Sequence, residues 1–420
     1  MRLATRLLPL LIVVMVLAVD LSTTTPRPPT ADDPTLGGTQ STRLVLPWLA
    51  GGHPSGQERY VAMDAALDVA GGFAYLASDG RLLVVDVRDP SHPRLGAEVM
   101  TEDQWADAWD AASVVVSGGY AYVLDRRVNG LIDDGLPDTR LLTFDITAPT
   151  APRLVSWLDI QEWAFTMAVV DGWLYVSVAG WDGLESEPRL GVATIDLSDP
   201  GHPRRHGFTE LGFFAYSSAV TGDRMVLAGA YDVWEAPPAG VMVLDLSQPG
   251  APRRVGAASG ERGLGWSVAV VGGTAVRAGY DGADAFDLAS PDMRLLPIDL
   301  GLPIDLEPLG NCSSMPRVTA DPRHFMMFAT CGDRGVLRVL AERREAGRLL
   351  GVDVVGSLPM DWRRVPSTHT ETYHMTYTVH GADDGLVYLM QPVADPGASA
   401  LLTIIDISTP TTPRIVGRLP

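Results

Sequence analysis

The chain repeats one pattern of hydrophobic and polar positions. An apolar run ends in an aspartate, a short Pro-containing turn follows, and Pro-Arg opens the next apolar run. The first copy runs from Leu82 to Asp86 and reaches Pro-Arg at Pro93 and Arg94. Further copies end at Asp145, Asp196, Asp245 and Asp406. A degenerate copy ends at Asp287, and a copy at residues 336–340 lacks the aspartate.

A second pattern precedes each copy. An apolar run, a tight turn centred on Gly or Asp, and an aromatic-rich run follow one another, as from Val69 to Tyr75. Such turns suit two-residue hairpins, which need positive φ. Similar segments start at Val116, Val170 and Val220, and weaker ones start at Val271, Val318 and Val379. Each unit therefore reads as four short antiparallel strands.

Four-stranded units that recur about every 40–65 residues are typical of propeller blades, because stacked neighbours cover one another's faces. The sequence predicts an all-β fold, a β-propeller of about seven four-stranded antiparallel blades over residues 61–420. A short helix around residues 341–349 is the one expected departure.

The pattern resembles the LVIVD-repeat β-propeller family, whose name spells the strand read here as Leu-Leu-Val-Val-Asp and Leu-Thr-Ile-Ile-Asp. The resemblance covers almost all of the chain after residue 60. It implies a propeller on the outside of a prokaryotic cell and no shared catalytic motif. The recurrent aspartates are interpreted as turn residues, because a carboxylate before such a turn accepts backbone N–H groups.

The N-terminal region predicts export. Arg2 and Arg6 precede an apolar run that is short for a membrane span, so residues 1–19 read as a signal peptide or a short anchor. Residues 20–42 form a Thr/Pro-rich linker, and residues 43–60 hold an unassigned strand and link. A secreted or cell-surface location follows, with membrane contact only through an uncleaved N-terminal segment. In an oxidising compartment, Cys312 and Cys331 are expected to form a disulfide.

The charge balance limits the kinds of ligand and partner that the chain is expected to bind. The formal net charge is −19, which disfavours nucleic acid and favours cationic ligands or basic surfaces. All basic residues are arginine, so Schiff-base and phosphate-loop lysine chemistry is excluded. The chain also lacks Gly-x-Ser-x-Gly and His-Glu-x-x-His, and no catalytic residue is assigned.

One face of the predicted propeller carries nearly all the long loops. In a four-stranded blade, the loops between the second and third strands and the links between blades share a face, here called the long-loop face. Its insertions cover residues 101–110, 125–140, 160–164, 181–190, 231–239, 359–372 and 391–400. Aromatic and acidic residues gather there, as on glycan- and protein-contact surfaces. The candidate binding residues are Trp105, Asp107, Trp109, Trp163, Trp181, Asp182, Trp234 and Glu235.

One insertion resembles part of a calcium loop. Asp125, Asn129, Asp133 and Asp134 are the candidate ligands, although Arg127 stands where an oxygen ligand belongs. Calcium is the one cofactor considered. The sequence favours a monomeric, exported binding module for a protein or glycan. Two alternatives stay open: a propeller enzyme, such as a carbohydrate-active hydrolase that uses carboxylates at the channel mouth, and a structural envelope protein.

Overall fold

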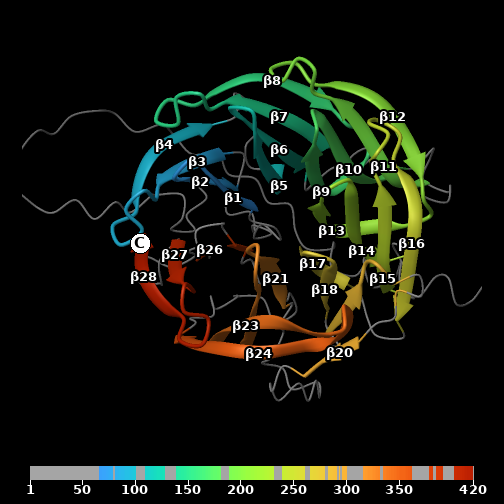
Figure 1. Cartoon of the computed structure of the whole chain (residues 1–420). Coiled ribbons are helices and arrows are strands. Elements are labelled where there is room, and N and C mark those ends of the chain that lie inside the picture. Colours follow the sequence, from blue (N-terminus) through green and yellow to red (C-terminus); the bar gives the residue numbers. More distant parts are fainter. Residues whose placement is uncertain are drawn as a thin grey trace, which may run out of the picture. The chain divides into compact units, whose positions relative to one another are not determined.

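The computed structural model describes most of the repeat region (Figure 1). The described residues are 66–78, 81–100, 109–127, 139–180, 189–230, 239–260, 265–279, 282–290, 293, 296–299, 316–331, 334–361, 378–381, 385–390 and 402–419. The chain divides into two units, Met1–Leu44 and Val45–Pro420, and all described residues belong to the second. The predicted signal segment and linker therefore lie outside them, as does the unassigned strand at residues 43–49.

The described residues form 28 strands in seven four-stranded antiparallel sheets, which confirms the predicted fold class. Blade 1 holds β1 (Ala66–Ala70), β2 (Phe73–Ser78), β3 (Arg81–Asp86) and β4 (Arg94–Met100); blade 2 holds β5 (Trp109–Ser117), β6 (Tyr120–Arg127), β7 (Thr139–Asp145) and β8 (Arg153–Asp159). Blade 3 holds β9 (Trp163–Val170), β10 (Trp173–Gly180), β11 (Arg189–Asp196) and β12 (Arg204–Glu210); blade 4 holds β13 (Phe214–Thr221), β14 (Arg224–Ala230), β15 (Ala239–Asp245) and β16 (Arg253–Gly260). Blade 5 holds β17 (Gly265–Val271), β18 (Thr274–Gly279), β19 (Gly282–Asp287) and β20 (Leu296–Ile298); blade 6 holds β21 (Arg317–Ala320), β22 (Phe325–Cys331), β23 (Arg334–Glu345) and β24 (Arg348–Asp361). Blade 7 holds β25 (Thr378–Gly381), β26 (Leu386–Met390), β27 (Leu402–Asp406) and β28 (Arg414–Leu419).

The blades stand in a ring (Figure 1). The first strand of each blade is innermost and contacts the first strand of the next blade, and β25 contacts β1 to close the ring. Each blade uses four consecutive strands, so the described residues show no strand exchanged between blades 1 and 7. Within the described part of the chain, no helix is long and apolar enough to cross a membrane.

The first hairpins of blades 1, 2 and 3 turn as the sequence predicts. Gly71 and Gly72 have φ of 60° and 80°, and Asp171 and Gly172 have φ of 49° and 79°. Positive φ at both central positions matches the twist of the flanking strands, and Gly or Asp adopts it at low cost. These turns fix the register of each inner strand against the second strand.

The core consists of apolar clusters between neighbouring blades. The middle strands are buried on both faces, because one face packs on the preceding blade and the other on the following blade. At the seam between blades 7 and 1, Leu76 and Leu83 pack with Tyr388 and Ile404. This two-sided burial explains why the middle strands read as nearly continuous apolar runs.

The recurrent aspartates hold turns, as the sequence predicts. The Thr147 N–H donates to Asp145 Oδ1 at 3.0 Å, and Arg153 Nη2 donates to Oδ2 at 2.8 Å. Equivalent backbone bonds reach Asp86, Asp196, Asp245, Asp287 and Asp406. Bonds from the Thr147 hydroxyl and N–H, together with Arg153, lower the pKa of Asp145 to about 2. The carboxylate is therefore part of the turn.

The same turns connect the blades. In the outer strand, a β-bulge is followed by a small residue that faces a turn of the next blade. Gly417 on β28 lies against the Pro90 carbonyl of blade 1. In blade 2, Ser156 occupies this position, and its hydroxyl donates to the Gly201 carbonyl of blade 3 at 2.6 Å. These contacts join the outer strand of one blade to a turn of the next.

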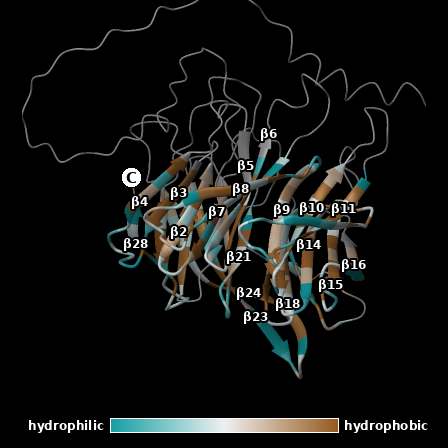
Figure 2. Cartoon of the chain, turned by 90° about the horizontal axis from the view of Figure 1, so that it is seen from above, coloured by the Kyte–Doolittle hydropathy of each residue, from teal (hydrophilic) through white to brown (hydrophobic). Residues whose placement is uncertain are grey.

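Blades 5 and 6 depart from the repeat. The predicted helix around residues 341–349 is wrong, since β23 and β24 form one long hairpin around Ala346 and Gly347, with φ of 49° and 82°. Local helix-forming residues are overridden by cross-strand pairing. The hairpin reaches beyond the other strands on one face of the ring (Figure 2).

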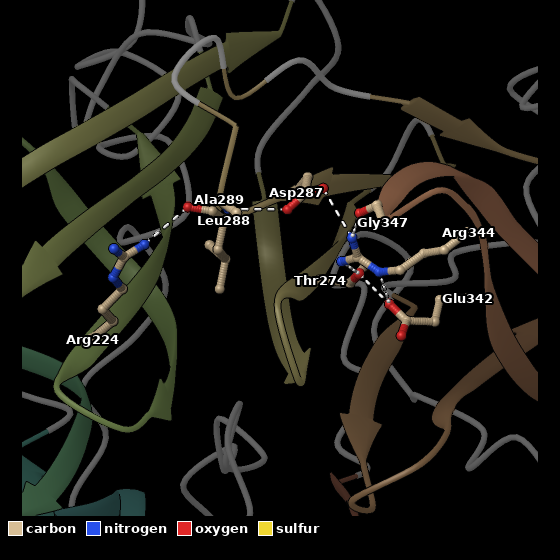
Figure 3. Close-up of polar contacts among 8 residues, drawn as sticks. All are labelled: Arg224, Thr274, Asp287, Leu288, Ala289, Glu342, Arg344 and Gly347. Carbon is tan, nitrogen blue, oxygen red and sulfur yellow. Dashed lines mark hydrogen bonds and ion pairs between the residues drawn. The ribbon is translucent and has the colours of Figure 1, made fainter.

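The hairpin is anchored to blade 5 by a polar network around Arg344 (Figure 3). Arg344 Nη1 donates to Asp287 Oδ2 at 3.0 Å, Nε donates to Glu342 at 3.0 Å, and Nη2 donates to Thr274 at 2.7 Å. Leu349 on β24 is buried beside blade 5. The extended hairpin thus replaces the short turn that joins neighbouring blades elsewhere.

Candidate ligand-binding surface

Most predicted site residues lie outside the described residues. These are Trp105, Asp107, Trp181, Asp182, Trp234 and Glu235 of the binding set, Asn129, Asp133 and Asp134 of the calcium set, and Cys312. The structure gives only the backbone of Trp109 in β5 and of Cys331 in β22. The disulfide stays a prediction. Trp163 is described with its side chain, at the start of β9 on the long-loop face.

The link before Trp163 is held in place. Ile160 is fully buried, and its N–H donates to the Thr139 carbonyl at 2.8 Å. Arg205 binds Glu162 through two bonds of 2.8 and 2.5 Å and donates a third, of 2.8 Å, to the Ile160 carbonyl. A bidentate guanidinium–carboxylate pair fixes orientation as well as distance. The link therefore presents Trp163 in a defined position.

Trp163 belongs to an aromatic group on the inner strands of blades 3 and 4. We call Trp163, Phe165, Phe214 and Tyr216 the inner-strand aromatic cluster. Ring centroids lie 5.5 Å apart for Trp163–Phe165, 5.0 Å for Phe165–Phe214 and 5.1 Å for Phe214–Tyr216, all edge to face. Phe214 is fully buried, whereas the other three are partly buried. Edge-to-face contacts of this kind hold aromatic rings in fixed orientations.

A recurrent β-bulge places two members of the cluster. Phe165 is the extra residue between Ala164 and Thr166 on β9, and Tyr216 is the extra residue on β13. The same bulge occurs at Ala112 on β5 and at Trp266 on β17. Blades 3, 4 and 5 thus carry Phe, Tyr and Trp at one structural position. Bulges re-aim side chains and are common beside functional sites.

Sequence reasoning missed Phe165, Phe214, Tyr216 and Trp266. A strand pattern assigns alternate residues to opposite faces, and a bulge breaks that alternation. One signal was available: an aromatic residue directly before a Ser or Thr that stands five positions before the first residue of the hairpin turn.

Hydroxyl side chains after the bulges tie the inner strands together. The Ser217 hydroxyl oxygen accepts the Val268 N–H of the next blade at 3.1 Å, and the hydroxyls of Thr166 and Ser218 are 2.8 Å apart. Ser267 both donates to the Val318 carbonyl and accepts its N–H, at 3.0 Å each. Hydrogen bonds between blades therefore hold together the inner strands that carry the aromatic residues.

Asp125, the described member of the calcium set, lies in a strand rather than in a loop. It pairs in register with Arg140 across β6 and β7, so the predicted insertion at residues 125–140 is shorter than expected. Its carboxylate is buried, and Arg140 Nη2 lies 3.3 Å from Oδ2. Within the described residues, no group of three or more His, Cys, Asp or Glu side chains could hold a metal ion.

Blade 5 contains a buried ion pair on its blade 4 side. Arg277 on β18 and Asp284 on β19 face each other across the strands, at 2% and 3% exposure. Arg277 Nη2 donates to Asp284, while Nε and Nη1 have no hydrogen-bond partner among the described residues. The blade 4 position equivalent to Arg277 holds the apolar Leu227. The pair replaces apolar packing by a charge interaction that depends on both partners.

Comparison with known proteins gives one family and several structures. The family model of the LVIVD repeat matches residues 62–101, 108–132 and 393–419. YjhT has a TM-score of 0.45 at 10% identity, over 70% of this chain and 98% of its own. PorZ, a bacterial surface component of the type-IX secretion system of Porphyromonas gingivalis, has a TM-score of 0.45 at 11% identity, over 86% of this chain and 39% of its own. AztD from Citrobacter koseri has a TM-score of 0.41 at 16% identity, over 80% of this chain and 88% of its own. No curated protein matches this chain.

Proposed function

From a chain that carries LVIVD repeats in a seven-bladed β-propeller, we propose an exported binding module that holds a protein or glycan at its long-loop face. The inner-strand aromatic cluster is the observation that supports this proposal. It lies where the links enter the inner strands, the end from which the predicted acidic and aromatic loops depart.

Rigidity makes the cluster suited to binding. Trp163 follows a link fixed by the Arg205–Glu162 pair, and its ring contacts Phe165. Aromatic residues that are held before binding lose little conformational freedom on binding, so more of the contact energy becomes affinity. Interface residues that contribute most to binding are enriched in Trp, Tyr and Arg.

Export is the second part of the proposal. The arginines and apolar run of residues 1–19 are typical of a signal peptide, and the following Thr/Pro-rich segment is typical of a linker. The linker would hold the propeller away from a membrane or wall. Its long-loop face would then be accessible to partners outside the cell.

A capture experiment tests the proposal. The full exported chain would be immobilised and exposed to envelope and culture-medium fractions from the source cells, beside Trp163→Ala and Trp157→Ala variants. Trp157 is a matched control, since it is 59% exposed on the outer strand β8. Retention of a protein or glycan by the native chain and the control, with loss in Trp163→Ala, supports the proposal. Equal retention by all three, or by none, contradicts it.

A further inference from the structure

Phe165, Tyr216 and Trp266 share one backbone position, the bulge on the inner strands of blades 3, 4 and 5. Three consecutive blades carry an aromatic residue at the same position of their inner strands. Blade 2 has Ala112 at the equivalent bulge, so an aromatic residue at this position is not a general requirement of the blade. The inner strands surround the ring axis, so these positions follow one another around it (Figure 1).

We propose that Phe165 and Tyr216 form a stacking site for an uncharged glycan chain, an inference that rests on the proposed binding function. Sugar rings have apolar C–H faces that pack on aromatic rings. Phe165 and Tyr216 lie 5.5 Å apart at 75°, so they offer differently oriented surfaces to successive sugars. In an oligosaccharide, each sugar ring is rotated relative to the one before it. Successive sugars can therefore pack on aromatic rings that differ in orientation.

The position on the inner strands favours a narrow ligand over a folded protein. Standard protein interfaces are broad, with about 800 Å² buried on each partner. Such an interface is expected to place its main aromatic contacts on an outward surface. Phe165, Tyr216 and the backbone of Trp266 instead lie on the innermost strands of blades 3, 4 and 5.

The net charge of the chain argues against an anionic glycan. The chain has a net charge of −19, which opposes anionic polysaccharides. Beside Trp163, the Glu162 carboxylate is neutralised by Arg205, so that pair leaves no net charge for a cationic sugar. Stacking that needs no ion pair is expected to be insensitive to salt.

Binding of defined oligosaccharides tests the inference. Cellohexaose, maltohexaose and N-acetylchitohexaose would be titrated calorimetrically into the full exported chain at low and high salt. We expect one of them to bind with an affinity that salt does not change, and Phe165→Ala to weaken it about tenfold. Tyr216→Leu, which keeps an apolar side chain, covers the case in which Phe165→Ala does not fold. Trp157→Ala serves as the control that retains affinity.

The outcomes separate this inference from the proposed function. Absence of binding by all three probes, or equal affinity in the native chain and both cluster variants, overturns the glycan site. Should the capture experiment then retain a protein through Trp163, the binding module stands and its ligand is a protein. Failure of both experiments overturns both.

Discussion

Gly417 at the seam of the ring gives the sharpest stability prediction. A Cβ atom added to Gly417 would meet the Pro90 carbonyl oxygen. The two atoms would be more than about 1 Å closer than 3.0 Å, the shortest separation that Cβ atoms normally show. Because that neighbour is backbone, the turn of blade 1 must retreat from β28. Gly207 occupies the equivalent position in blade 3, where a Cβ would meet only Thr194 Oγ1, at 3.4 Å.

The comparison of Gly417→Ala with Gly207→Ala isolates the clash. Both substitutions reduce the freedom of the unfolded chain by a similar amount, so this effect cancels between them. Overpacking a rigid contact costs about 1–3 kcal/mol. We therefore expect the free energy of unfolding of Gly417→Ala to be about 2–3 kcal/mol smaller than that of Gly207→Ala.

Equilibrium urea unfolding, followed by both circular dichroism and tryptophan fluorescence, measures the difference. Coincident transitions and an unchanged denaturant slope would show that the two variants can be compared directly. Free energies within about 0.5 kcal/mol of each other would refute the close contact of β28 with blade 1.

Three further predictions concern polar groups. Asp145 has its folded pKa lowered to about 2, so its contribution to stability is present above pH 4 and is lost as the pH falls toward 2. Asp145→Asn should flatten the melting temperature against pH in that window; an unchanged slope contradicts the turn role. Arg344→Met should lower the melting temperature, whereas Arg343→Met, which removes an exposed ion pair, should have little effect; equal losses would show that the anchor to blade 5 is unimportant. Arg277→Met alone should cost about 3–5 kcal/mol in urea unfolding, whereas the double variant with Asp284→Leu should recover most of the loss; additive losses would argue against the pairing.

The repeated part of the fold could be predicted because its signals are local. Apolar runs, Gly-Gly turns and Asp-Pro turns recur with the blade, and each signal fixes a hairpin without knowledge of the rest of the chain. Residues 341–349 misled the prediction, since Ala, Glu and Arg favour helix in isolation. The pairing of β23 with β24 and the left-handed conformation at Ala346 and Gly347 depend on the surrounding blade.

The candidate site was less predictable. Trp163 could be identified because tryptophan in a link between blades is conspicuous in a sequence. Phe165 and Tyr216 looked like ordinary strand residues, since the bulges that re-aim them depend on how the first and second strands pair. Arg277 and Asp284 also carry no warning in the sequence, because their partnership is set by the register of β18 and β19.

The arrangement of four consecutive strands in each blade affects how the chain completes folding during its synthesis. Leu67, Leu76 and Leu83 on the flank of blade 1 are covered by Tyr388 and Ile404 of blade 7. Each intermediate blade receives its neighbour soon after it emerges, but this first flank stays in contact with water for almost the whole time of translation. The partly folded protein is therefore an open row of blades with one exposed apolar flank. It is prone to aggregation until β27 and β28 dock on blade 1.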